Sequence, residues 1–185
     1  MKKEEEEINM KKILSIIVGL ILMLTLASCQ NGKKFAENDF KASMEALQKG
    51  DFSKLNSDKE SVEALQVFSG AYKKLTYKIN KVTEESKDKV LVNVTMKYPD
   101  LSEAGKIFQN KLLKESQKLE GKSDAEIEKQ SMQFLKESID KKLNDKNLKY
   151  LEETFDMVYV KQNGKWELEG NNLQFIKVVS FNYKM

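Results

Sequence analysis

Hydrophobic residues recur every three or four positions along two segments near the start of the polar body of the chain. This spacing is typical of amphipathic helices, because about 3.6 residues make one helical turn. The first segment spans about 35–49 and ends at Gly50-Asp51. The second opens at Ser57, where Glu60 three residues later completes a capping box, and it continues to Tyr72. The apolar positions that define these helices are Ala36, Phe40, Met44 and Leu47, then Val62, Leu65, Phe68 and Tyr72.

The period of the pattern then changes to two, which indicates β-strands. Hydrophobic and polar residues alternate over 75–79, and again over 90–98 after a charged turn at 84–88. In the second strand the even positions are apolar and the odd positions 93, 95 and 97 are polar. Pro99, the single proline of the chain, ends this strand.

Helical spacing returns over 101–145. Asp100 and Glu103 suggest a capping box, Gly121 separates two helices, and Ser123 with Glu126 opens the second one. We expect a helical hairpin or two crossing helices, inserted between pairs of strands. Its outer faces are rich in Lys and Glu, which favours a solvated surface laced with ion pairs, and docking of a partner protein is the alternative.

The last part of the chain alternates again, with Leu151, Phe155, Met157 and Tyr159 on one face. Asn163-Gly164 is a strong hairpin signal, and the return strand begins at Trp166 and Leu168. After 170–172 the apolar residues move to odd positions, and this shift of one residue predicts a bulge or a break. The shifted positions are Leu173, Phe175, Val179, Phe181 and Tyr183.

The order of elements is therefore two helices, two strands, two helices and two strands. Hairpin connections between consecutive strands favour an antiparallel sheet. The predicted fold class is α+β, with helices packed on a curved antiparallel sheet of about four strands. We expect one domain over 35–185, with the helical insertion at 101–145.

An apolar run over 13–27 follows Lys11 and Lys12 near the N-terminus. It is shorter than the ~20 residues that a membrane-spanning helix needs, and it has the layout of a secretory signal peptide over 1–28. The run ends in Leu26-Ala27-Ser28-Cys29. These four residues resemble the lipobox of bacterial lipoproteins.

The resemblance implies cleavage between Ser28 and Cys29 and a diacylglyceryl thioether on Cys29. Residues 29–34 would then form a lipidated tether, and the protein would be anchored to the outer face of the cytoplasmic membrane, or to an outer membrane if the cell has one. The alternative is that Cys29 is an ordinary buried thiol in a membrane anchor.

Residues 1–9 do not fit a signal peptide, because Glu4–Glu7 place negative charge where positive charge belongs. Met10-Lys11-Lys12 is a normal start by itself. Our hypothesis is that translation begins at Met10, and the alternative is a genuine acidic extension.

Composition excludes several function classes. The 185 residues include 32 basic and 29 acidic ones, so a net charge of +3 speaks against a basic nucleic-acid binder. The chain has no His and one Cys, which excludes His-ligated metals, Cys-rich zinc sites, internal disulfides and imidazole-based triads. We expect no cofactor. Every basic residue is Lys, so an anion site must use ammonium or backbone N–H groups.

The order of elements resembles the nuclear-transport-factor-two-like or cystatin-like family, and more narrowly the small lipoproteins of unknown function that carry such a domain. The residues behind the comparison are the lipobox at 26–29, Leu47–Phe52, and the terminal hairpin Asn163–Leu168. The resemblance implies a sheet curved around helices, whose cone mouth binds a small apolar ligand. It carries over no catalytic motif, and the long helical stretch 101–145 departs from the usual single helix.

Four residues are candidates for a ligand pocket. Glu153 shares a strand face with apolar residues, where burial could raise its pKa, although a position near a strand end would leave it in solvent. Tyr98, Tyr159 and Trp166 could line the same pocket, although aromatic residues on strands more often pack in the core.

These observations favour a non-enzymatic binding or interaction module on a membrane anchor. Its partner would be an envelope protein, a peptide or a small apolar ligand. The alternative is a small hydrolase or isomerase that uses a carboxylate and a tyrosine in the cone.

Overall fold

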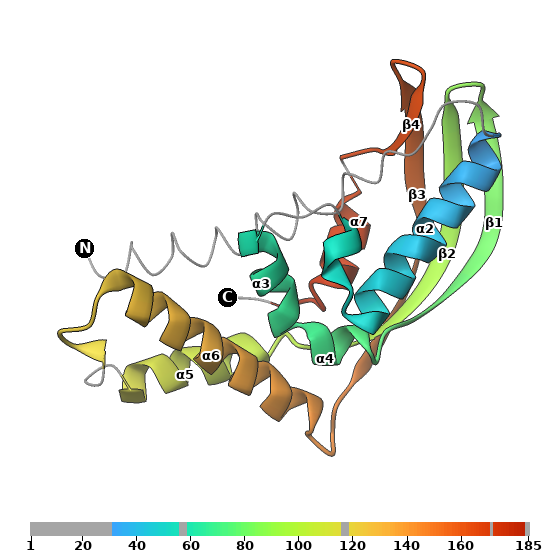
Figure 1. Ribbon diagram of the computed structural model, residues 1–185. Coiled ribbons are helices and arrows are strands. Elements are labelled where there is room, and N and C mark those ends of the chain that lie inside the picture. Colours follow the sequence, from blue (N-terminus) through green and yellow to red (C-terminus); the bar gives the residue numbers. More distant parts are fainter. Residues whose placement is uncertain (1–30, 56–58, 116–118, 171, 184–185) are drawn as a thin grey trace.

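The computed structural model describes residues 31–55, 59–115, 119–170 and 172–183 (Figure 1). The predicted signal peptide 1–28, the predicted lipid attachment at Cys29 and the predicted start at Met10 lie outside these residues. The elements, in chain order, are α2 (Gly32–Lys49), the short 3₁₀ helix η1 (Phe52–Leu55), α3 (Lys59–Val67), α4 (Ser69–Tyr72), β1 (Thr76–Ser86), β2 (Lys89–Pro99), α5 (Ala104–Glu115), α6 (Asp124–Leu143), β3 (Tyr150–Gln162), β4 (Lys165–Leu168) and α7 (Leu173–Val179).

The sheet has four antiparallel strands in the order β1-β2-β3-β4, so each strand pairs with its neighbour in sequence. The even positions of β2 from Val90 to Tyr98 are fully buried, while the odd positions from Leu91 to Lys97 are not. The sheet curves, and α2 and α7 lie against its concave side (Figure 1). The predicted α+β class with four antiparallel strands is confirmed.

Helix α2 has well-defined ends. The Asn31 side chain accepts a hydrogen bond from the backbone N–H of Lys33, which supplies the N-cap. Gly50 ends the helix in the left-handed region at φ 71°, where a residue without Cβ is unstrained. The helix begins three residues before the predicted start at Phe35, so residues 32–34 of the predicted tether form its first turn.

The expected shift to odd strand positions over 173–183 is wrong, because α7 occupies 173–179. Phe175, Val178 and Val179 have the i, i+3, i+4 spacing of a helix face, and all three are buried. In so short a segment the odd-position pattern and the helical pattern share Phe175 and Val179, so spacing alone could not separate them.

Two other boundaries differ from expectation. The predicted second helix is divided into α3 and α4 at Phe68, and its capping residue Ser57 lies outside the described residues. Asp100 and Glu103 form no capping box. The Asp100 carboxylate accepts the backbone N–H of Ser102, and α5 begins only at Ala104.

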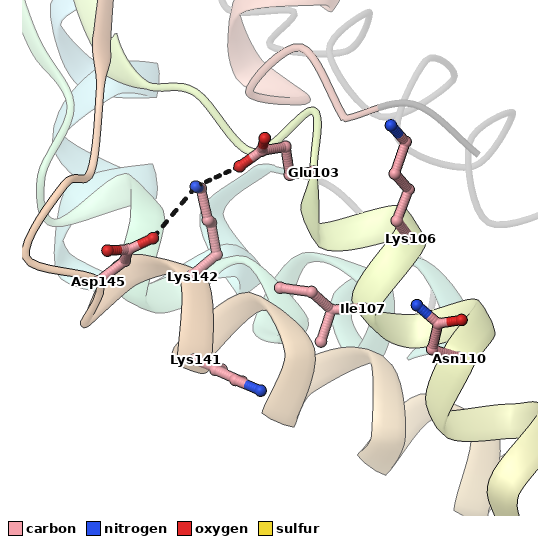
Figure 2. A pocket seen from close by; sticks show the side chains of 7 residues that line it. All are labelled: Glu103, Lys106, Ile107, Asn110, Lys141, Lys142 and Asp145. Carbon is pink, nitrogen blue, oxygen red and sulfur yellow. Dashed lines mark hydrogen bonds and ion pairs between the residues drawn. The ribbon is translucent and has the colours of Figure 1, made fainter.

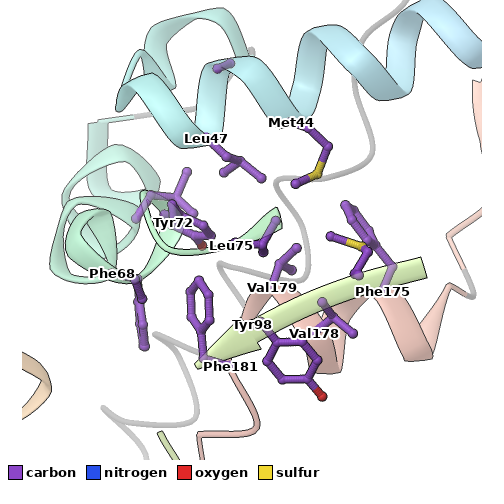
Figure 3. Close-up of a cluster of buried hydrophobic side chains, with 14 of the residues drawn as sticks. Met44, Leu47, Phe68, Tyr72, Leu75, Tyr98, Phe175, Val178, Val179 and Phe181 are labelled. Atoms are coloured by element: carbon purple, nitrogen blue, oxygen red, sulfur yellow. The ribbon is translucent and has the colours of Figure 1, made fainter. Parts of the chain in front are cut away.

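The core fills the concave side of the sheet. Met44 and Leu47 of α2 point toward Phe175, Val178 and Val179 of α7, above β2 (Figure 3). Aromatic rings join the layers, with Phe40 5.3 Å from Tyr77 and 6.2 Å from Phe175 between ring centroids. Along the described ranges, no helix has both the length and the apolar character needed to cross a membrane.

Candidate functional site

A surface pocket of about 380 Å³ lies between α5 and α6 (Figure 2). The start of α5 and the end of α6 supply its walls. The side chains that line it are Glu103, Lys106, Ile107, Asn110, Lys141, Lys142 and Asp145.

Lys142 is the most deeply placed charge of the pocket, with a side chain only 11% exposed. Its ammonium group donates to Glu103 Oε2 at 2.5 Å and to Asp145 Oδ2 at 3.3 Å. The hydrogen bond to Glu103 raises the pKa of Lys142, and Lys142 in turn helps to lower the pKa values of both carboxylates. This cation is therefore neutralised within the protein and joins α5 to α6.

Lys106 and Lys141 differ from Lys142, because neither forms an ion pair with any residue in the described part of the chain. Together with the amide of Asn110 they present hydrogen-bond donors toward solvent. Each ammonium group can attract a carboxylate or phosphate group by charge, without the two-pronged geometry of Arg. No hydroxyl or thiol side chain lines the pocket in the part of the chain that the structure describes.

The structure brings two of the four predicted site residues together, at one end of β2 and β3. The Tyr98 hydroxyl donates to Glu153 Oε1 at 2.6 Å, Lys177 of α7 reaches the same oxygen at 2.7 Å, and Gln174 reaches the other oxygen. Burial by itself would raise the pKa of Glu153, but these hydrogen bonds lower it below its ordinary value. Glu153 is thus a paired carboxylate that joins α7 to the sheet.

Tyr159 lies toward the other end of β3 and bonds a residue that the pattern did not single out. Its hydroxyl donates to Asp39 of α2 at 3.0 Å. Burial raises the pKa of Asp39 to about 6, and the Tyr159 hydrogen bond opposes this rise. Nothing in the sequence marks Asp39, since an acidic residue beside an apolar helix face is normally solvated.

Trp166 of β4 packs against the first turn of α2. A Cβ added at Gly32 would lie 2.3 Å from the indole ring. The core buries Tyr98, Tyr159 and Trp166. This is the alternative interpretation, since aromatic residues on strands more often pack in the core. None of the four predicted residues lines the pocket between α5 and α6. Ligand binding by them stays a prediction.

Within the described ranges, no three Cys, His, Asp or Glu side chains gather closely enough to hold a metal ion. The hairpin of α5 and α6 has no exposed apolar stripe there, because Leu113 is its one large hydrophobic residue with high exposure. The ion pair Lys111–Glu137 joins α5 to α6, and Lys136–Asp140 lies along α6.

No family model and no curated protein matches the chain. One solved structure that is similar belongs to a candidate lipoprotein, ycdA, of Bacillus subtilis subsp. subtilis str. 168, with a TM-score of 0.42 and 21% identity. The match covers 80% of this chain, and this chain spans about half, 47%, of that one. This match does not confirm the resemblance to the nuclear-transport-factor-two-like or cystatin-like family.

Proposed function

We propose that the protein is an exported lipoprotein, tethered through acylated Cys29 to the outer face of the cytoplasmic membrane, and that its α+β domain is a non-enzymatic binding module. The observation that carries the proposal is Leu26-Ala27-Ser28-Cys29 at the end of a complete signal-peptide pattern. The described fold supports the proposal in one respect, because α2 begins at Gly32, three positions after Cys29 in the sequence.

Binding is favoured over catalysis by the state of the acidic residues. Glu153, the predicted base, is held by three donors and its pKa is lowered, so it is a weak base. The hydrogen-bonded pair of Asp39 and Tyr159 lies between α2 and β3, and neither residue lines the α5–α6 pocket. The pocket also presents Lys106 and Lys141, which form no ion pair with the described residues and which suit an anionic group on a partner or ligand.

The lipid anchor is tested by expressing the full chain in a bacterium that processes lipoproteins. We expect the protein to enter the detergent phase on Triton X-114 partitioning, and mass spectrometry to find an N-terminal diacylated cysteine. Cys29→Ser should abolish the diacylated cysteine and leave residues 1–28 attached, while Ser28→Ala, which keeps a small residue before the cleavage point, should preserve the parent's result. An unmodified Cys29 with residues 1–28 still attached would overturn the proposal.

The binding module is tested with the native lipoprotein, crosslinked in membranes and analysed for attached proteins and small molecules. We expect the double variant Lys106→Glu, Lys141→Glu to lose a partner that the parent retains. The matched control is Lys114→Glu, Lys129→Glu, which reverses two lysines on the same helices outside the pocket lining. Equal capture by both double variants would exclude the pocket as the binding site.

A further inference from the structure

The folded domain begins very close to the expected lipid. Asn31 caps α2, and only one residue separates Asn31 from Cys29 in the sequence. A chain extends at most about 3.3–3.6 Å per residue, so the Cα atoms of Cys29 and Asn31 are no more than about 7 Å apart. A lipid on Cys29 would therefore keep the first turn of α2 close to the membrane surface.

That first turn is joined firmly to two hairpin turns. Gly32 packs against the Trp166 ring, which fixes α2 to β4. The backbone N–H of Lys161 donates to the carbonyl of Asp88 at 2.9 Å, which fixes the β3–β4 turn to the β1–β2 turn. We call this part of the domain the anchor end, and it comprises residues 31–34, 86–89 and 161–166. Figure 1 shows these segments gathered at one end of the molecule, with α5 and α6 at the opposite end.

The anchor end has a polar surface suited to headgroups and not to the bilayer interior. It exposes five lysines and includes the carboxylate of Asp88, while Lys89 is engaged in an ion pair with Glu85 at 2.9 Å. The large exposed hydrophobic residues Leu113, Tyr150 and Leu173 all belong to other segments of the described chain. The exposed lysines are Lys33, Lys34, Lys87, Lys161 and Lys165.

We propose that the acylated protein stands on the membrane on its anchor end, with these lysines at anionic headgroups, and that it holds the α5–α6 pocket away from the bilayer. The proposal rests on the proposed lipidation of Cys29. A cation within the Debye length of about 8–10 Å feels the surface potential of the leaflet, and Lys33 and Lys34 are only four and five positions from Cys29 in the sequence. The pocket is then presented to molecules outside the membrane.

The test uses the full lipoprotein reconstituted into vesicles of phosphatidylglycerol and phosphatidylcholine. Because Cys29 is the single natural cysteine and acylation consumes its thiol, one introduced cysteine can be labelled alone. Lys165→Cys places a nitroxide at the anchor end, and Glu128→Cys places it on α6. With a paramagnetic nickel chelate on the headgroups, we expect several-fold stronger relaxation at position 165 than at 128. Equal relaxation at both positions would overturn the proposal.

Two matched variants distinguish the effect of the short connection to the lipid from the effect of the lysine charges. A flexible Gly-Ser insertion between Gln30 and Asn31 should remove most of the difference between positions 165 and 128, because it frees the domain from the lipid. Lys33→Glu, Lys34→Glu should reduce the difference on anionic vesicles while the protein stays membrane-bound. If mass spectrometry finds no diacylated Cys29, the lipidation itself fails. If Cys29 is diacylated but both labels relax alike, only the orientation fails.

Discussion

Tyr159 of β3 donates a hydrogen bond to Asp39 of α2 at 3.0 Å, across 120 positions of sequence. The tyrosine is buried against the concave side of the sheet, and the carboxylate is partly covered by the packing of α2 onto that side. Removing an acid from water favours its protonated form, and this is why the pKa of Asp39 rises to about 6. The packing of α2 on the sheet is thereby coupled to pH.

Asp39 should make stability fall as pH rises. The folded protein binds the proton of Asp39 more tightly than the unfolded chain does, where the Asp pKa is near 3.8. The stability gained from protonated Asp39 is therefore fully present below about pH 4, and it is lost as the pH rises through about 6. We expect Asp39→Asn to be more stable than the parent by about 1–3 kcal/mol at pH 7 and similar to it at pH 4. Urea unfolding followed by Trp166 fluorescence measures this difference.

The control is Glu37→Gln, an exposed carboxylate on the same helix that pairs with Lys41. It should leave the pH dependence between 4 and 7 unchanged. Parallel pH profiles for the parent and for Asp39→Asn would show that the hydrogen-bonded pair has no titration of this kind.

Glu153 should have the opposite pH dependence. Its pKa is lowered in the folded state, so its contribution is present above the ordinary value of 4.5 and is lost as pH falls. Glu153→Ala leaves the buried Tyr98 hydroxyl and Lys177 without their acceptor, which should cost about 1–3 kcal/mol at pH 7. Glu153→Gln should cost less, because its amide oxygen still accepts from Tyr98. The exposed neighbour Glu152 supplies the control Glu152→Ala, and an equal loss for both alanines would contradict this role.

Gly32 should not tolerate a side chain. Alanine normally favours a helix over glycine by about 1 kcal/mol, but a Cβ at 2.3 Å from the Trp166 ring forces the ring or α2 to move. We expect Gly32→Ala to lower the free energy of unfolding by about 1–3 kcal/mol, as overpacking does. In the background of Trp166→Leu the same change should cost little or stabilise, which circular dichroism can follow. A cost that is unchanged by Trp166→Leu would place the strain elsewhere.

Gly164 should also be required, for a backbone reason. Asn163 and Gly164 have φ of 52° and 79°, the left-handed pair that a two-residue hairpin needs. We expect Gly164→Ala to cost about 1–2 kcal/mol, because Cβ meets the following carbonyl in this region. Lys165→Ala, which changes an exposed side chain on the same hairpin, should be nearly neutral. Equal thermal midpoints for the two variants would rule out the backbone explanation.

The sequence pattern predicted much of the fold, because these features depend on interactions between residues that are close together in the chain. The even positions of β2 from Val90 to Tyr98 had to face one side, and that side is the core. Asn163-Gly164 selects its turn through its own backbone preferences. The start of α6 follows the same logic, because Glu126 accepts hydrogen bonds from the N–H and hydroxyl of Ser123.

Residues 173–183 show where local pattern is ambiguous. Phe175 and Val179 satisfy both a strand and a helix period, and the segment is too short for periodicity to discriminate. The choice of helix is made by packing, since Phe175 meets Phe40 of α2 and Phe155 of β3.

By itself, the sequence predicts an export address, and it determines the placement of most strands and helices and the class of the fold, since each depends on residues a few positions apart. Only the tertiary structure decides which polar groups meet. Tyr98 lies near Glu153 because β2 pairs with β3 in one register, Tyr159 reaches Asp39 because α2 crosses the sheet at one angle, and the pocket exists because α5 packs on α6. Such contacts depend on the packing of whole elements, which no local spacing of residues specifies.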